Sequence, residues 1–381
     1  MEPFLLEEYF AEHEFTAKHL LAQSDAESVS LKELVGMADD ECLKLWDECR
    51  LGYTEAQGLP SLRDEIAAKF YPGLARTNVR TFAGAEEAIY ACFRSLIKQG
   101  DEVVVFTPAY QSLMSVAKAA GATVIALDLE SLEENGWKFP INKLSEVVSN
   151  KTRMVVVNAP HNPTGAMFTS EHQQEIIAIC RKVGAILFSD EVYRDMEIDP
   201  SDRLDPAALI YEKAISLGVL SKAAGLAGLR VGWIACQDIN ILETISGYKH
   251  YLSICNSAPS EILSIIALRN YDRLISKNKA IVIQNLEIIS GFFRRFPDLF
   301  DWNPPKGGCT AFVKWKGVKP LDIVARILVE KAGVLILPGR NYPGCNGNFS
   351  QYFRLGFGRR SFPECLRSLE DALNANILDD K

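Results

Sequence analysis

The sequence predicts an α/β fold with one large, mostly parallel α/β/α sheet domain and a second, smaller α+β domain. Two observations support this prediction. Between about residues 84 and 260, short β-branched runs alternate with segments of helical periodicity, the pattern of parallel strands joined by crossover helices. After about residue 260 the alternation stops, and a long helical segment is followed by a Pro/Gly-rich turn and shorter runs.

The N-terminal 50 residues are acidic and helical in character, with a turn-prone stretch at residues 24–28. Pro60 is expected to open the next helix, because proline is tolerated in the first turn. Leu62, Ile66 and Phe70 then recur at helical spacing.

The central region contains six expected strands and three expected helices. The strands are residues 102–106, 122–127, 153–157, 185–189, 214–220 and 231–235. The helices are residues 86–97, 112–119 and 170–182.

The last third of the chain is expected to begin with one long helix, about residues 259–296. A turn at 304–308 and short runs at 310–315, 334–337 and 352–357 follow. We therefore expect a large domain at residues 50–270 and a discontinuous small domain assembled from residues 1–49 and 271–381.

Composition excludes several classes of protein. The chain has 381 residues, of which 48% are hydrophobic and 24% charged, values typical of a globular protein. A net charge of −8 argues against nucleic-acid binding through a broad basic surface. No stretch of about 18 apolar residues lacks a charge, and the N-terminus has no signal-peptide pattern, so we expect a soluble, cytoplasmic protein without a membrane partner.

Cysteine and histidine give no indication of a metal site. The nine cysteines are widely spaced and include no C-x-x-C pair, and the five histidines form no H-E-x-x-H motif. Dinucleotide, Walker A and G-x-S-x-G motifs are also absent. An S-x-x-K at residues 95–98 lies at the end of a helical segment without its companion motifs, so we attribute it to chance.

Four sequence blocks remain, and their order is informative. They are YTEAQGLPSLR at residues 53–63, NAPHNPTG at 158–165, SDEVY at 189–193 and LSKAAGLAGLR at 220–230. Together they resemble the class I and II aminotransferases, enzymes of fold type I that use pyridoxal 5'-phosphate. The resemblance extends from Tyr53 to Arg354, and residues 107–122 and 220–233 are similar to the capreomycidine-synthase-like branch.

The resemblance identifies Lys222 as the residue that binds the cofactor covalently. Its amine must be neutral to react, and burial or a nearby cation such as Arg230 lowers the pKa of a lysine. Without the other motifs, Lys222 would be read as a surface lysine in a Gly/Ala-rich loop. Arg230, eight positions later, matches the residue that binds the cofactor phosphate through its planar donor group.

Further phosphate contacts are implied by the same resemblance. The helix start at Gly84, Ala85 and Glu86 offers unpaired N–H groups and a favourable dipole. Tyr53 matches a tyrosine that binds the phosphate of the partner subunit, which implies a homodimer. The family usually has a hydroxyl where this chain has Val219, so Ser221 or water is the expected replacement.

The cofactor ring has four expected neighbours. Asp190 ends an apolar strand, where an unpaired carboxylate is costly, and the resemblance pairs it with the pyridine nitrogen; the alternative is an N-cap of the next helix. Asn162 and Tyr193 match residues that hydrogen-bond the ring 3′-oxygen. Tyr110 matches an aromatic residue stacked on the ring, or else it is a tyrosine at the cavity rim.

The substrate is expected to contact Arg354 and the segment around Ser24. Arg354 is a charge inside an apolar strand and therefore needs a partner. The resemblance makes that partner the substrate α-carboxylate, whereas a buried salt bridge is the alternative. Ser24 and Asp25 lie where the family places a loop near the substrate, and Asp25 or Glu27 is a candidate to face a cationic or hydroxylated side chain; a solvated turn is the alternative.

The resemblance implies an aminotransferase that moves an amino group between an L-amino acid and a 2-oxo acid. The alternative is a pyridoxal-phosphate-dependent lyase or cyclase that expels a β-substituent. A transcription regulator built on the same fold is not expected, because the roughly 50 residues before Tyr53 are acidic and contain no helix-turn-helix pattern.

Overall fold

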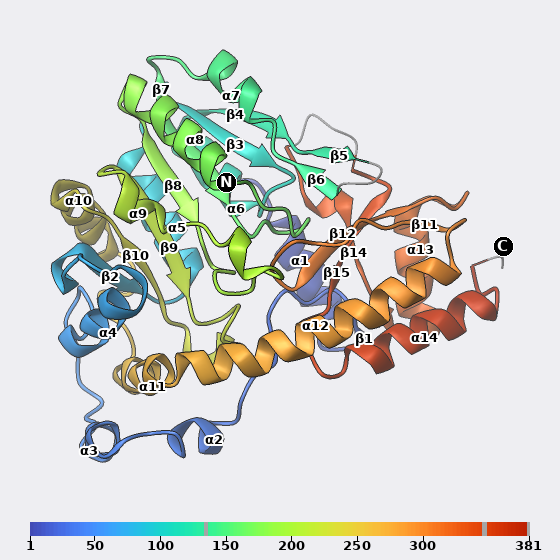
Figure 1. The fold of residues 1–381 in the computed structure, drawn as a ribbon, viewed down its shortest axis with the longest axis horizontal. Helices are drawn as coiled ribbons and strands as arrows, with labels where there is room; N and C mark the ends of the chain where they lie inside the picture. The colour runs from blue at the N-terminus through green and yellow to red at the C-terminus, as the bar shows by residue number, and fades with distance from the viewer. Residues whose placement is uncertain (133–135, 345–348, 379–381) are drawn as a thin grey trace.

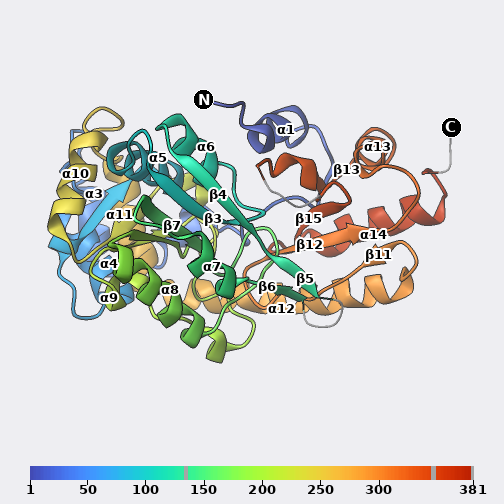
Figure 2. The same ribbon diagram turned by 90° about the horizontal axis from the view of Figure 1, so that it is seen from above.

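The structure is a computed structural model, and it describes residues 1–132, 136–344 and 349–378. One of the nine cysteines, Cys345, lies outside the described residues, as do residues 133–135 of the expected large domain and residues 345–348 and 379–381 of the expected small domain. The molecule is elongated, with a large sheet at one end and a smaller sheet at the other (Figures 1 and 2). No helix in the described ranges is both long and apolar enough to span a membrane.

The large sheet has seven strands and is mostly parallel, as predicted. In spatial order they are β2 (Val79–Phe82), β10 (Gly232–Ala235), β9 (Ala214–Val219), β8 (Ile186–Asp190), β7 (Thr152–Asn158), β3 (Glu102–Thr107) and β4 (Thr123–Asp128). Only β10 runs antiparallel to its neighbours, β2 and β9. The carboxyl ends of the other six strands therefore share one edge of the sheet.

Helices cover both faces of this sheet (Figure 2). On one face lie α5 (Ala85–Leu96), α6 (Ser112–Ala119) and α10 (Ile239–Lys249), and on the other α7 (Ile141–Val147), α8 (Ser170–Val183) and α9 (Ala207–Ile210). Alternate residues of each strand enter different cores. Val103 and Val105 pack in one hydrophobic cluster, and Val104 and Phe106 in the other. Strands buried on both faces explain the continuous apolar runs in the sequence.

Strand β2 is absent from the expected strands. Its central residues, Arg80 and Thr81, are polar, yet they are 3% and 0% exposed. The Arg80 guanidinium pairs with Glu243 at 2.6 Å and donates to the Ser246 hydroxyl at 2.9 Å, so tertiary partners compensate its burial. A polar pattern of this kind gives no strand signal in the sequence.

The smaller sheet is antiparallel and is built from the C-terminal third. Its order is β11 (Phe300–Asp301), β12 (Thr310–Trp315), β15 (Tyr352–Gly356) and β14 (Leu337–Pro338). A separate parallel pair joins β1 (His19–Leu20) to β13 (Val334–Leu335), which brings the N-terminal segment against the C-terminal part. The division into domains at residues 49/50 and 270/271 stays a prediction.

The expected single helix at 259–296 is wrong, because the structure has two helices there. These are α11 (Ala258–Arg269) and α12 (Tyr271–Arg295). Asn270 interrupts them: its side-chain amide donates to the carbonyls of Ile266 at 2.9 Å and Met37 at 3.0 Å. Side-chain bonds to local backbone carbonyls of this kind compete with helix continuation.

The remaining elements are short. They are the helices α1 (Leu5–His13), α2 (Leu31–Val35), α3 (Asp40–Asp47), α4 (Pro60–Phe70), α13 (Leu321–Ile327) and α14 (Phe362–Asn374), the strands β5 (Glu130–Leu132) and β6 (Gly136–Lys138), and single turns at Arg76–Asn78, Pro200–Asp202, Ala227–Leu229, Leu328–Ala332 and Gly339–Asn341. Helix α4 begins at Pro60, as expected.

Candidate active site

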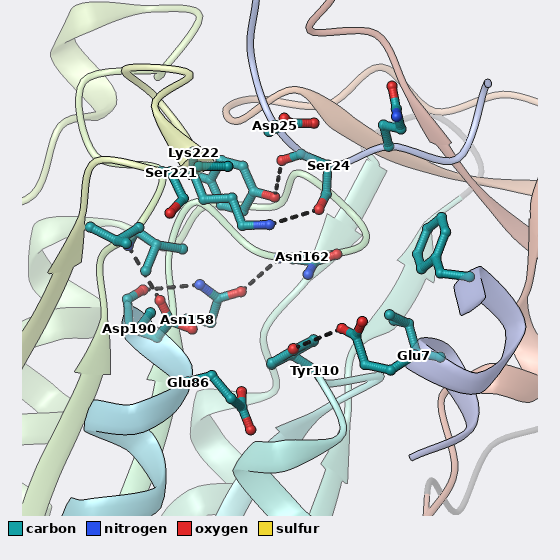
Figure 3. Close-up of a pocket in the computed structure, with 18 of the residues that line it drawn as sticks. Glu7, Ser24, Asp25, Glu86, Tyr110, Asn158, Asn162, Asp190, Ser221 and Lys222 are labelled. Carbon is teal, nitrogen blue, oxygen red and sulfur yellow. Dashed lines mark hydrogen bonds between the residues drawn. The ribbon is translucent and has the colours of Figure 1, made fainter. Parts of the chain in front are cut away.

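A cavity of about 410 Å³ lies at the carboxyl ends of β7, β8 and β9. Helix α1, the start of α5 and strand β15 complete its wall (Figure 3). Twelve of the thirteen predicted site residues line it: Ser24, Asp25, Ala85, Glu86, Tyr110, Asn162, Asp190, Tyr193, Ser221, Lys222, Arg230 and Arg354. Tyr53 does not line it, and its side chain is 90% exposed.

Lys222 follows the end of β9 and extends its amine into the cavity (Figure 3). The amine donates a hydrogen bond to the Ser24 hydroxyl at 2.8 Å. Burial lowers the pKa of Lys222, and the nearby Arg354 guanidinium lowers the pKa further. Arg354 is thus the principal cationic neighbour of the amine, in place of Arg230, which the sequence had suggested. Both effects favour the neutral, nucleophilic amine.

Arg230 meets the N-terminus of α5 at Gly84. Arg230 has a left-handed backbone (φ +54°), and a side chain at Gly84 (φ +91°) would place its Cβ 2.5 Å from Arg230 Nη2. Gly84 therefore makes room for the guanidinium. Since Gly84 provides no side-chain cap, the first N–H groups of the twelve-residue helix α5 remain available beside the Arg230 guanidinium. This combination is suited to binding an anion.

Asp190 ends β8 and is 5% exposed. Its Oδ1 accepts one hydrogen bond, from the N–H of Val192 at 3.2 Å, and burial raises its pKa to about 7. A turn rather than a helix follows Asp190, so the alternative of a helix N-cap is wrong. A carboxylate buried at this position is stabilised by a cationic partner, and such a partner can reach Asp190 from within the cavity.

Asn158 is a neighbour that sequence reasoning did not assign. At the end of β7, its amide donates to the Asp190 carbonyl at 2.9 Å, and its Oδ1 accepts from the N–H of Asn162 at 2.7 Å. Asn158 thereby fixes the backbone of Asp190 and of Asn162 relative to each other. The signal was present in the NAPHNPTG block, which begins with this residue.

Arg354 is 2% exposed and projects from β15. It donates twice to the Ala22 carbonyl, at 3.1 and 2.7 Å, and its Nη1 donates to Asn162 Oδ1 at 3.3 Å and to the Tyr342 hydroxyl at 3.1 Å. No carboxylate among the described residues forms an ion pair with it. The alternative of a buried salt bridge therefore does not explain the burial of Arg354. Within the described part of the chain its guanidinium has only uncharged hydrogen-bond partners, and it is available to bind an anion.

Tyr193 is 1% exposed and donates to the Ser24 carbonyl at 2.5 Å. Ser24 therefore contacts two predicted site residues, since its hydroxyl accepts from Lys222. The sequence predicted that Ser24 lies near the substrate, but its hydrogen bonds to Lys222 and Tyr193 could not be predicted, because these residues are distant in sequence.

Helix α1 contributes cavity residues that no sequence motif indicated: Leu6, Glu7, Phe10 and, after its end, Glu14. Glu7 Oε1 accepts from the Tyr110 hydroxyl at 3.2 Å (Figure 3). On the other side, the Glu86 carboxyl is buried, which raises its pKa to about 7. Tyr110 thus lies between two acidic side chains, and burial raises its own pKa.

Asp25 is already paired in the structure. Both of its carboxylate oxygens accept from Nη2 of Arg359, at 2.9 and 2.8 Å, and Arg359 also lines the cavity. Glu27, the other acidic candidate, accepts from the N–H of Arg360 at 2.8 Å. Arg359 could not be assigned from the sequence, because two adjacent arginines after a strand read as a solvated turn.

The chain is similar to several known proteins. Residues 39–362 match the family model described as aminotransferase class I and II. Capreomycidine synthase from Streptomyces vinaceus is 32% identical over 345 residues, covering 88% of this chain and 85% of that protein. Aspartate aminotransferase from Geobacillus stearothermophilus is 27% identical over 319 residues, covering 80% and 79%.

Solved structures with this fold cover the whole chain. A PLP-dependent aminotransferase from Streptococcus suis superposes with a TM-score of 0.90 at 28% identity, covering 100% of this chain and 99% of that one. The PLP-dependent cyclase OrfR gives a TM-score of 0.88 at 26% identity, with coverage of 100% and 98%. The similar proteins thus include both a transferase and a cyclase.

Proposed function

The chain belongs to the class I and II aminotransferase family, and on this basis we propose that it moves an amino group between an L-amino acid and a 2-oxo acid at Lys222. One observation carries the proposal. A lysine of lowered pKa, an arginine without a carboxylate partner and an anion-binding helix start share a single cavity. These are the groups needed for an amine, a carboxylate and a phosphate.

Members of this family depend on pyridoxal phosphate, and the residues present fit that cofactor. Arg230 and the N-terminus of α5 suit its phosphate, and Ser221 adds a buried hydroxyl that makes no hydrogen bond within the described structure. Asp190 suits the ring nitrogen. When bound, pyridoxal phosphate withdraws electrons from the α-carbon of an amino acid.

Asp190 is proposed to keep the ring nitrogen protonated. At about 3 Å and an effective dielectric constant near 20, a carboxylate and a cation attract by on the order of 5 kcal/mol before desolvation. That is enough to return Asp190 to its ionised form despite burial. The Val192 N–H holds the carboxylate, and Asn158 holds the backbone of Asp190, in place for this role.

Lys222 is proposed to take the proton from the substrate α-carbon. The lowered pKa provides a neutral amine that accepts a proton, and the Ser24 hydroxyl orients it. Arg354 is proposed to hold the α-carboxylate by a pair of parallel hydrogen bonds, which turns the α-carbon toward Lys222.

Three further residues are proposed to contact the cofactor ring. Tyr110 covers one face of the ring, and Asn162 and Tyr193 hydrogen-bond its oxygen. In the structure the Tyr193 hydroxyl donates a hydrogen bond to the Ser24 carbonyl, so donation to the ring oxygen requires that hydroxyl to turn.

A homodimer is proposed to complete the site. Tyr53 lies outside the cavity of its own subunit and is 90% exposed, as are Leu51 and Tyr251 at 89% each. In this arrangement Tyr53 would donate its hydroxyl to the phosphate bound by the partner subunit.

The second candidate function is that of a lyase or cyclase. The similarity to capreomycidine synthase and to the cyclase OrfR favours it. After Lys222 has removed the α-proton, it would deliver that proton to the cofactor in transamination. In the second candidate, the electron pair left at the α-carbon would instead expel a substituent from the β-carbon. The same residues therefore support both outcomes, and the substrate decides between them.

A product assay separates the two candidates. The purified protein is incubated with pyridoxal phosphate and a panel of L-amino acids, including basic and β-hydroxylated ones. Transamination yields a 2-oxo acid and pyridoxamine phosphate in equal amounts. Pyruvate with ammonia, or a cyclised amino acid, supports the second candidate. If no amino acid is converted, or if Lys222→Ala converts them equally well, both candidates are wrong.

A further inference from the structure

Lys249 is a buried lysine, remote from the candidate active site. It ends α10, is 2% exposed and does not line the cavity. Its amine donates three hydrogen bonds: to the Ala56 carbonyl at 2.7 Å, to the Thr81 carbonyl at 2.8 Å and to Asn256 Oδ1 at 3.2 Å. A lysine is almost never buried this far unless its charge is paired.

The amine has no salt bridge among the described residues, so a charge pair does not explain its burial. Burial lowers the pKa of Lys249, while the carboxylates of Glu87 and Glu261 raise it. Its direct partners are all uncharged oxygens. The segments that carry these oxygens indicate what the amine holds together.

The three acceptors belong to three different segments. Ala56 lies in the segment at residues 53–58, which begins with Tyr53. Thr81 belongs to β2, three residues before Gly84 at the start of α5. Asn256 lies in the loop before α11; its amide donates to the Phe82 carbonyl at 3.2 Å, and its carbonyl accepts from the Thr54 hydroxyl at 3.2 Å.

Two carboxylates complete the same network. Glu261 Oε1 accepts from the N–H of Leu59 at 3.1 Å, just after the 53–58 segment. Glu87 accepts from the N–H of Ala83 at 2.5 Å and from the N–H of Ser253 at 2.9 Å. The segment 53–58, strand β2 and the start of α5 are therefore all joined to the end of α10 or to the loop after it. This end of α10 lies with β2 and α11 at the end of the molecule remote from the smaller sheet (Figure 1).

We propose that Lys249 is a positioning residue for cofactor binding, which holds the segment 53–58 and the backbone leading to Gly84 in fixed relative positions. The proposal rests on the proposed function, in which Gly84 and Tyr53 contact phosphates of the two subunits of a dimer. Lys249 then links the phosphate site of one subunit to the tyrosine that this subunit contributes to its partner.

The experiment compares Lys249→Met with the matched control Arg80→Met. Arg80 is also a buried cation between β2 and α10: it is 3% exposed, donates to Ser246 and pairs with Glu243, but has no bond to the segment 53–58. Both variants lose buried hydrogen bonds, so a general loss of stability affects both. Only the Lys249 variant loses the bond to Ala56.

Two quantities are measured on protein freed of cofactor: the Kd for added pyridoxal phosphate, and amide hydrogen exchange at residues 53–58. Lys249→Met is expected to raise the Kd roughly tenfold or more and to accelerate exchange, because bonds from a charged donor are lost. Arg80→Met is expected to leave both quantities near those of the native protein. Equal values for the two variants would overturn the proposal.

A milder variant covers the case in which Lys249→Met does not fold. Thr54→Val removes the bond from the Thr54 hydroxyl to the Asn256 carbonyl and its bond to the Glu261 side chain. The first of these joins the segment 53–58 to the loop of Asn256, which Lys249 also contacts. This variant is expected to change both quantities in the same direction by a smaller factor, and unchanged values would contradict the proposal. If the native protein binds no pyridoxal phosphate, the proposed function fails, whereas the exchange comparison still tests the positioning role.

Discussion

The Lys222 amine donates a hydrogen bond of 2.8 Å to the hydroxyl of Ser24, a residue 198 positions earlier in the chain. The carbonyl of the same serine accepts from Tyr193. The N-terminal segment therefore lies directly over the candidate catalytic lysine, and parts of the chain remote in sequence close the cavity together.

Arg230→Met is expected to weaken the binding of pyridoxal phosphate by roughly tenfold to a hundredfold, because a phosphate loses a charged hydrogen-bond donor. Pyridoxal, which lacks the phosphate, is the matched ligand, and its Kd is expected to stay the same. Titrating cofactor-free protein with both ligands provides the measurement. An equal loss for the two ligands would show that Arg230 does not contact the phosphate.

Gly84→Ala is expected to weaken cofactor binding, since the new Cβ would lie 2.5 Å from Arg230 Nη2. Gly100→Ala is the control: Gly100 has nearly the same φ, +89° against +91°, but no atom within 4 Å of the added Cβ. Both variants should lose about 1–3 kcal/mol of stability from backbone strain. Only Gly84→Ala should also raise the Kd for pyridoxal phosphate; a similar Kd for both variants would contradict the role of Gly84.

The fold could be predicted where strands are buried on both faces. Strands β3, β7 and β8 can be recognised from their apolar runs, because both faces of each strand pack in a hydrophobic core. Strand β2 could not be predicted, since its buried Arg80 is compensated by Glu243 on a helix more than 150 residues away. The helix break at Asn270 likewise could not be predicted, because the Asn270 amide donates to the carbonyl of Met37, which is distant in sequence.

Asp190 is expected to make the stability of the cofactor-free protein depend on pH. Its pKa is about 7 in the folded state against an ordinary value of 3.8. Between these values the folded state holds a proton that the unfolded state releases, so stability falls as pH rises from about 4 to 7. One such proton contributes at most about 1.4 kcal/mol per pH unit.

Urea unfolding of native protein and Asp190→Asn at several pH values between 4 and 7 tests this expectation. Glu86, whose pKa is also raised to about 7, contributes in the same direction in both proteins and cancels in the difference. The native protein should lose stability with rising pH more steeply than the variant. Parallel curves would show that Asp190 is ionised throughout this range.

Asp25→Asn is expected to shift substrate preference toward amino acids with acidic side chains, because it leaves Arg359 at the cavity without its carboxylate partner. The partial exposure of Arg359 limits the change in relative kcat/KM to a few-fold, roughly tenfold at most. Glu27→Gln is the control, since Glu27 accepts from a backbone N–H outside the cavity lining. An identical substrate profile for both variants would identify this segment as a solvated turn.

The candidate site could be predicted to the extent that it lies in local motifs. Asp190 ends one strand, Asn162 follows another and Lys222 lies in a Gly/Ala-rich block, and the structure brings all three to one cavity. Glu7 and Arg359 carry no motif, because α1 and the turn after β15 acquire their positions only from long-range packing. Sequence reasoning for the same reason named Arg230, rather than Arg354, as the cation that lowers the pKa of Lys222.

The central claim is that Lys222 binds pyridoxal phosphate, and reductive labelling tests it directly. The native protein is loaded with pyridoxal phosphate, treated with borohydride and digested, and the modified lysine is located by mass spectrometry. Lys249, also buried and of lowered pKa but outside the cavity, is the control within the same chain. The claim predicts a single phosphopyridoxyl group on Lys222; labelling of Lys249 or another lysine instead, or no labelling, would contradict it.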